Sequence, residues 1–213
     1  LASKYIGSLN FDNKEDNFID HKTRVNQKRT EVSYKEEDPI KASVLRFYNK
    51  GFNNNLSQRY KVKLLMAIVD KIFFNEIREK NKLVYSIFMG EYFSQKLPIE
   101  LISIILGYDS DPENVDIINK KIENILNGVK NKNFDKQIFI NQKKALINEL
   151  RNVQNTNKYW INSLIRADKY KENFERYAYI EQIINQISLN EISLLAKKYF
   201  DENYFNSIQL IKE

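Results

Sequence analysis

The sequence predicts an α+β domain in which an antiparallel or mixed β-sheet is covered by helices on one face. Three observations indicate this class. β-rich runs lie on both sides of one long helical pattern in the first half of the chain. Helical periodicity then dominates after Gly128, because no Gly or Pro follows it. A short alternating segment near the C-terminus returns to the strand pattern.

The first thirty residues are expected to lie outside this domain. Residues 1–9 lack an initiator Met and the plan of a signal peptide, so they are interpreted as the tail of a preceding domain. Residues 10–30 are polar and have no sustained period, which is typical of a linker or a long surface loop. We therefore expect a chain fragment whose own α+β domain covers residues 31–213.

The next elements are two β-rich runs and a long helix. The strands are expected at Val32–Tyr34 and Lys41–Tyr48, followed by a loop at Gly51–Leu56. Ser57 is the expected N-cap of a helix over about Gln58–Glu79. Its apolar residues cover more than one face, so the helix should be buried on two sides. These residues are Leu64, Leu65, Ile68, Val69, Ile72, Phe73 and Phe74.

Two adjacent strands are predicted after this helix, over Leu83–Phe93 and Ile99–Tyr108. Pro98 is compatible with the second of them, because proline is tolerated at the start of a strand. The next helix should begin at Asp111 as N-cap, with Pro112 at the first helical position. Its expected end is Gly128. The apolar stripe of this helix consists of Val115, Ile118, Ile122, Ile125 and Val129.

Helices and one closing strand are expected in the rest of the chain. Ser188 and Glu191 form a capping box that opens a short helix reaching about Phe200. Residues Asn206–Ile211 alternate in the manner of a strand. Three earlier helices are marked by Phe139, Leu146, Leu150 and Val153, then by Trp160, Leu164 and Ala167, then by Tyr177, Ile180 and Ile184.

Composition indicates a folded chain and excludes several site types. Among 213 residues, 42% are hydrophobic and 13% aromatic, which argues against disorder. The net charge of +6 comes from 34 basic and 28 acidic residues that are scattered, so a solvated surface is favoured over an anionic partner. The absence of Cys excludes disulfides and thiolate ligands. No apolar run has the length of a membrane span, so we expect a soluble chain and leave its compartment open.

The segment Ile77–Ser86 has the clearest functional content. It places Arg78 and Tyr85 seven residues apart at the predicted turn from helix to strand. A guanidinium and a phenolic hydroxyl can together bind a carbonyl or stabilise an oxyanion. The structural alternatives are a helix-end cation near Glu76 or Glu79, and a strand tyrosine whose hydroxyl is satisfied locally.

Three segments together resemble one enzyme family. They are Ile77-Arg-Glu-Lys-x-x-Leu-Val-Tyr-Ser86, Lys4-Tyr-Ile-Gly-Ser-Leu9 and Gly107-Tyr-Asp-Ser-Asp-Pro-Glu-Asn-Val115. With the order of elements, they resemble the terminal domain of the pitrilysin/insulinase zinc metallopeptidases over nearly the whole chain. The first segment is fairly specific, and the other two are supportive.

The resemblance implies that Arg78 and Tyr85 reach a bound peptide as auxiliary catalytic residues. It also implies a zinc ion, held by an inverted His-x-x-Glu-His helix in an earlier domain, that polarises the scissile carbonyl. This chain has no such motif, and its one histidine, His21, lies in the polar linker. No zinc is therefore expected on this chain. Lys82 departs from the family, in which Gly is frequent, and Asn81 is the expected left-handed residue instead.

The sequence thus favours the C-terminal fragment of a zinc metalloendopeptidase. This fragment is expected to bind the substrate's peptide backbone, to help stabilise the transition state in a closed chamber, and to be inactive on its own. Its expected partners are an upstream catalytic domain or a partner subunit, and a peptide or unfolded polypeptide substrate. The alternative is a non-catalytic homologue that acts as a scaffold or peptide-binding subunit. A nucleic-acid-binding domain is permitted by charge but lacks a supporting motif. No membrane partner is expected, and homo-oligomerisation stays open.

Overall fold

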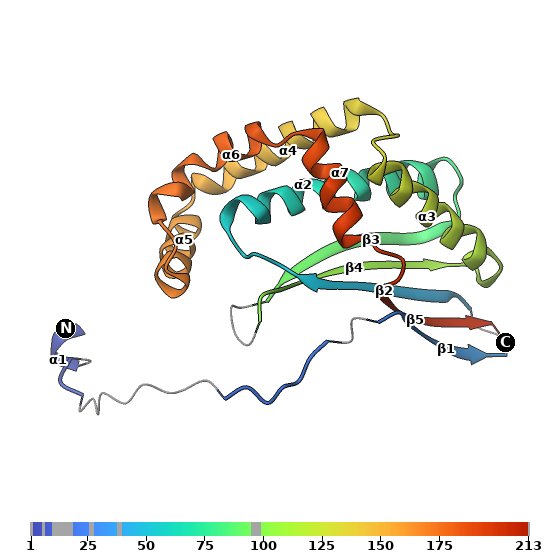
Figure 1. Ribbon diagram of the computed structural model, residues 1–213, viewed down its shortest axis with the longest axis horizontal. Coiled ribbons are helices and arrows are strands. Elements are labelled where there is room, and N and C mark those ends of the chain that lie inside the picture. Colours follow the sequence, from blue (N-terminus) through green and yellow to red (C-terminus); the bar gives the residue numbers. More distant parts are fainter. Residues whose placement is uncertain are drawn as a thin grey trace.

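A five-stranded mixed β-sheet forms the base of the fold, with the helices of the domain on one face (Figure 1). The computed structural model describes residues 2–5, 7–9, 19–25, 28–37, 40–94 and 99–212. The strand order is β1-β5-β2-β4-β3; β1 and β5 are parallel, and the other neighbours are antiparallel. The predicted α+β class is confirmed. The strands are β1 (Thr30–Glu36), β2 (Ala42–Gly51), β3 (Val84–Phe93), β4 (Leu101–Ser110) and β5 (Phe205–Lys212).

The helical layer has α2 next to the sheet, with α4 and α6 on its far side (Figure 1). This placement confirms that the long helix is buried on two sides. The helices are α1 (Ala2–Tyr5), α2 (Leu56–Phe73), η1 (Phe74–Glu79), η2 (Pro112–Asn114), α3 (Val115–Lys130), α4 (Lys136–Gln154), α5 (Asn157–Tyr170), η3 (Phe174–Tyr179), α6 (Ile180–Gln186) and α7 (Leu189–Tyr199).

The core lies between the sheet and this helical layer. In β4, the helix-facing residues Ile102, Ile104 and Leu106 are fully buried, as a two-residue period requires. The main apolar cluster continues into α2, α3 and α7. A second cluster lies beneath α4, α5 and α6, and its buried members are Leu56, Ile147, Leu150, Ala167, Tyr177, Ile180 and Ile184.

Helix starts agree with the sequence at α7 and differ at α2. The capping box is confirmed, because the Ser188 hydroxyl accepts from the Glu191 amide at 3.2 Å and Glu191 accepts from the Ser188 amide at 2.9 Å. The predicted cap at Ser57 is wrong. Asn55 caps α2 by accepting from the Gln58 amide at 3.0 Å. The first turn begins earlier because Leu56 already packs in the second cluster.

The predicted end of α3 at Gly128 is also wrong. The helix continues to Lys130, and the left-handed residue that follows is Lys132, with φ 60°. Gly128 instead lets the next loop approach the helix: its carbonyl accepts from the Asn133 amide at 2.7 Å. A Cβ at Gly128 would lie 3.0 Å from the Asn133 carbonyl oxygen.

Other sequence predictions need smaller corrections. The fourth strand starts at Leu101 rather than Ile99, and Pro98 lies outside the described residues. Two predicted stripe residues, Val153 and Leu164, are 40% and 52% exposed and do not belong to the core. Part of the predicted linker, residues 10–18 and 26–27, also lies outside the described residues. Among the described helices, none is both long enough and apolar enough to cross a bilayer.

Candidate functional site

The helix that leads to the site ends in a π-helical turn. The sequence predicted one helix to Glu79, but α2 ends at Phe73 and η1 continues the chain. The Lys80 amide donates to the Asn75 carbonyl, five residues back, at 3.1 Å. A π-turn spreads the residues of the last turn more widely, and such turns are frequent at functional sites. Arg78 lies in this turn.

The turn from η1 into β3 is closed by two backbone hydrogen bonds. The Lys82 amide donates to the Arg78 carbonyl at 3.0 Å, and the Leu83 amide donates to the Ile77 carbonyl at 3.1 Å. Lys82 itself is left-handed, with φ 49°, so the prediction that Asn81 would take this conformation is wrong. The side chain of Asn81 donates to the Glu76 carbonyl instead. These bonds hold Arg78 and the start of β3 in one rigid unit.

Arg78 projects an exposed side chain from this unit. Its guanidinium carbon lies 5.6 Å from the centre of the Phe74 ring, a cation–π arrangement. Glu76 is paired with Lys80 at 2.6 Å. Within the described residues, Arg78 forms no ion pair with Glu76 or Glu79, so the alternative of a local carboxylate contact does not apply. The guanidinium donors therefore remain available to a ligand.

Tyr85 lies at a β-bulge near the start of β3. Val84 pairs with Ser110 and Ser86 pairs with Asp109, so Tyr85 has no opposite residue on β4. The side chain of Tyr85 is 55% exposed, and its hydroxyl donates to a carboxylate oxygen of Asp111. This hydrogen bond, together with the charge of Asp111, raises the pKa of Tyr85. The phenol is therefore neutral and able to donate at physiological pH.

A second carboxylate, Asp109, lies beside the bulge and accepts hydrogen bonds from three side chains. It accepts from the Ser43 hydroxyl at 2.6 Å, from the Lys41 ammonium at 3.0 Å and from the Ser86 hydroxyl at 3.3 Å. The Ser43 hydrogen bond is the largest cause that lowers the pKa of Asp109, and Lys41 adds to it. Asp109 is thus a fixed anion that joins β2, β4 and β3 at the end next to Tyr85.

The sequence pattern predicts Arg78 and Tyr85 as site residues but gives no signal for the two carboxylates at this end of the sheet. It indicates Asp111 only as a helix cap and gives Asp109 no role. A period of two along the strands could have placed Ser43, Ser86 and Asp109 on one face, but strand pairing is needed to bring them together.

The open face of the sheet carries an apolar surface next to this site. Its residues alternate along the strands with the core-facing ones. On β4, Gly107 is covered by the Phe88 ring, since a Cβ at Gly107 would lie 2.5 Å from that ring. The exposed apolar members come from β1, β2, β3 and β5, and they are Val32, Tyr34, Leu45, Phe88, Tyr92, Ile208 and Leu210. A continuous exposed apolar surface is typical of a binding face.

Comparison with known families identifies the domain. Residues 1–146 match the family described as the peptidase M16 inactive domain. The chain belongs to the peptidase M16 family. This confirms the resemblance to pitrilysin-type metallopeptidases. A comparison with curated proteins found no match.

Solved structures share this M16 fold. The periplasmic protease PqqL from Escherichia coli is 18% identical, with a TM-score of 0.72, over 90% of this chain and 21% of PqqL. A protease from Helicobacter pylori is 14% identical, with a TM-score of 0.75, over 98% and 50% of the two chains. The ferredoxin protease FusC, in a mutant form bound to Arabidopsis ferredoxin, is 14% identical, with a TM-score of 0.72, over 88% and 20%. This M16 domain thus spans about a fifth of PqqL and of FusC.

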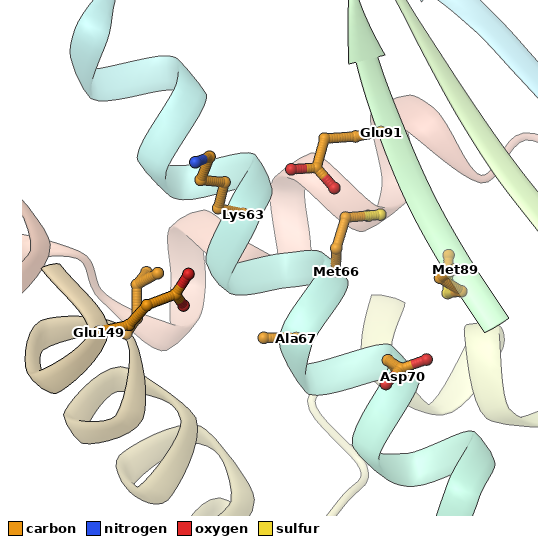
Figure 2. A pocket seen from close by; sticks show the side chains of 8 residues that line it. Lys63, Met66, Ala67, Asp70, Met89, Glu91 and Glu149 are labelled. Atoms are coloured by element: carbon orange, nitrogen blue, oxygen red, sulfur yellow. The ribbon is translucent and has the colours of Figure 1, made fainter. Parts of the chain in front are cut away.

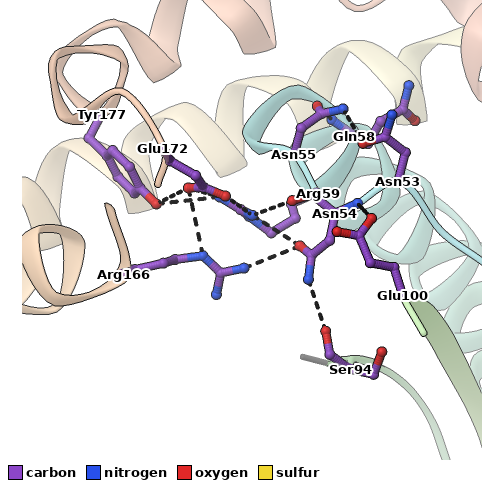
Figure 3. Close-up of polar contacts among 10 residues, drawn as sticks. All are labelled: Asn53, Asn54, Asn55, Gln58, Arg59, Ser94, Glu100, Arg166, Glu172 and Tyr177. Atoms are coloured by element: carbon purple, nitrogen blue, oxygen red, sulfur yellow. Dashed lines mark hydrogen bonds and ion pairs between the residues drawn. The ribbon is translucent and has the colours of Figure 1, made fainter. Parts of the chain in front are cut away.

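A buried polar network fixes the end of the domain away from the bulge (Figure 3). Arg59 of α2 binds Glu172 with both Nη atoms, at 2.9 and 3.0 Å, and also donates to Asn54. The amide of Asn54 donates to the Ser94 carbonyl at the end of β3, and Tyr177 donates to Glu172 at 2.5 Å. These groups satisfy one another, so the network joins α2, β3 and the α5–η3 loop and has a structural role.

A separate pocket between α2, α4 and β3 has three carboxylates on its lining, from Asp70, Glu91 and Glu149 (Figure 2). Burial raises the pKa of Asp70 and that of Glu91. The carboxylates come from three elements and are spread around the pocket. In the part of the M16 domain that the structure describes, no group of three or more His, Cys, Asp or Glu residues is arranged to hold a metal ion. These described residues therefore do not form the zinc site of a metallopeptidase.

Proposed function

We propose that this M16 domain binds the backbone of a polypeptide substrate within a zinc metalloendopeptidase. The observation that carries the proposal is that Arg78 and Tyr85 extend exposed polar groups from one rigid turn. The guanidinium offers donors only, and the neutral phenol offers one more. Two such donors fit a peptide carbonyl and the oxyanion that forms from it during hydrolysis.

The zinc ion belongs, in this proposal, to an upstream domain of the same polypeptide or to a partner subunit. The donor set of this chain supports that placement, since it has one histidine and no cysteine. Residues 1–30 then form the tail of a preceding domain and a linker, and residues 31–213 form the C-terminal substrate-binding domain. The chamber closes when this domain meets the catalytic one.

A protein or unfolded polypeptide is the substrate class that the surroundings of the site favour. The exposed apolar residues of the open face begin at Phe88 of β3, beyond the polar residues around Asp109, and extend to β1. An extended polypeptide has apolar side chains on alternate positions that such a face can bind. The complex of the related protease FusC with ferredoxin supports a protein as the bound molecule.

A scaffold or peptide-binding subunit without catalysis is the second candidate. The hydrogen bond from Tyr85 to Asp111 favours it, because the phenol proton is then used within the domain. The cation–π contact of Arg78 with Phe74 points in the same direction. Both contacts are exposed, however, and are therefore weak enough to exchange for a substrate.

The two candidates are tested by peptide turnover in the longer polypeptide, which is the protein that contains this domain together with the proposed upstream catalytic domain. Tyr85→Phe should lower kcat about a hundredfold with zinc still bound, because one oxyanion donor is lost. The matched control is Tyr179→Phe, which alters a similarly exposed tyrosine on η3, away from the sheet, and should leave turnover unchanged. Wild-type turnover in Tyr85→Phe would favour the scaffold.

A further inference from the structure

Asp111 stands where a helix cap is expected, but its side chain is used elsewhere. It is the N-cap residue of η2, with φ −60° and ψ 141°, and its side chain makes no capping hydrogen bond. An Asp at this position normally accepts from the second or third amide of the helix, which stabilises the helix start. Here the carboxylate accepts from the hydroxyl of Tyr85 instead.

The backbone around Asp111 is held so that this contact is maintained. The Asn114 amide donates to the Asp111 carbonyl at 3.0 Å, and the Ser110 hydroxyl donates to the same carbonyl at 3.0 Å. Ser110 also pairs with Val84, the residue before the bulge. The carboxylate and the phenol are thus attached to the two strands of one pair, at the same end.

We propose that Asp111 is a positioning residue that holds the ring of Tyr85 in the orientation from which substrate is bound. The inference rests on the proposed function, because it assigns Asp111 to the same site. Tyr85 is exposed, and little packing restrains its side chain. The side chain of an unrestrained tyrosine on a strand populates several staggered χ1 wells, so its ring has the substrate-binding orientation only part of the time. A charge-assisted hydrogen bond selects a single well.

A substrate oxygen can still accept a hydrogen bond from the phenol. The hydroxyl rotates about its C–O bond while the ring stays in place, and it then donates to the substrate oxygen. Asp111 is exposed, so water replaces the phenol at its carboxylate. The ring is therefore preorganised at little cost in binding energy.

The direct test measures the Tyr85 ring in this chain. With labelled tyrosine, assigned by the signal lost in Tyr85→Phe, side-chain couplings should show one χ1 well in the wild type and averaging in Asp111→Ala. Asp111→Asn keeps an accepting oxygen and should restore the single well. Glu113→Gln, a change to an exposed acid two residues further on, is the matched control and should have no effect. A single unchanged well in Asp111→Ala would overturn the inference.

The kinetic test separates this inference from the proposed function. In the longer polypeptide, Asp111→Ala should lower kcat/KM about threefold, because the competent ring orientation falls to about one of three staggered wells. In the Tyr85→Phe background, Asp111→Ala should leave kcat/KM unchanged, since no hydroxyl remains for Asp111 to hold. Equal losses in both backgrounds, or no loss in either, would overturn the role of Asp111. Wild-type turnover in Tyr85→Phe alone would instead overturn the proposed function.

Discussion

Arg59 and Glu172 lie 113 residues apart in the sequence and form a bidentate ion pair in the fold. Their side chains are only 7% and 16% exposed. Burial by itself raises the pKa of Glu172, but the hydrogen bonds from Arg59 and Tyr177 outweigh it and lower that pKa below its usual value. The pair ties the start of α2 to the loop after α5.

Removal of the Arg59 cation should destabilise the domain strongly. Arg59→Met removes the bidentate partner of Glu172 and leaves only the longer contact to Arg166, at 4.0 Å, so we expect the free energy of unfolding to fall by about 3 kcal/mol. Urea unfolding at pH 7 measures this. The control is Arg151→Met, since Arg151 is 60% exposed in its pair with Glu181 and should contribute little to stability. Equal losses in the two variants would contradict the structural role of the network.

The same pair should make stability depend on pH in the acid range. Because the pKa of Glu172 is lower in the folded than in the unfolded protein, its contribution is complete above the unfolded value, near 4.5. It is lost as the pH falls through the folded pKa. Wild type should therefore lose more stability than Arg59→Met between pH 5 and the acid limit. Parallel urea titrations of both proteins check this, and curves of equal slope would refute it.

Lys82 is a residue whose replacement by Gly should stabilise the protein. Its φ of 49° is costly for a side chain with a Cβ, whereas Gly adopts it freely. We expect Lys82→Gly to raise the free energy of unfolding by about 1 kcal/mol. Thermal unfolding measures the gain. Lys80→Gly is the control, because Lys80 is right-handed at φ −73° and Gly there should be destabilising. A loss of stability in Lys82→Gly would show that the Lys side chain makes a compensating contact.

Arg78 and Tyr85 should act as a unit if they bind one substrate group. In the longer polypeptide, Arg78→Ala and Tyr85→Phe should each lower kcat without unfolding the domain. The double variant should lose less than the product of the two single losses, because each change already disrupts the shared contact. Steady-state kinetics with zinc content measured in parallel checks this. Strictly multiplicative losses would mean that the two residues act on separate groups.

The isolated chain should bind no stoichiometric zinc and cleave no peptide. Its one histidine, its lack of cysteine and its spread carboxylates offer no set of three converging ligands among the described residues. Metal analysis of the purified chain and a peptide cleavage assay with and without chelator test this. Chelator-sensitive hydrolysis by this chain alone would place the metal site here and refute the proposed division of labour.

Sequence patterns predict the features that depend on near neighbours along the chain. Alternation and helical periodicity located the strands and helices, and the spacing of Ser188 and Glu191 located a capping box, because these signals act within one turn or one strand. The motif also located Arg78 and Tyr85 at the helix-to-strand turn. Tertiary structure alone decided which group each side chain meets. The partner of Tyr85 is 26 residues away, and strand pairing brings it close. The left-handed residue is Lys82 rather than Asn81 because the backbone hydrogen bonds from Lys82 and Leu83 to η1 determine where the chain must reverse.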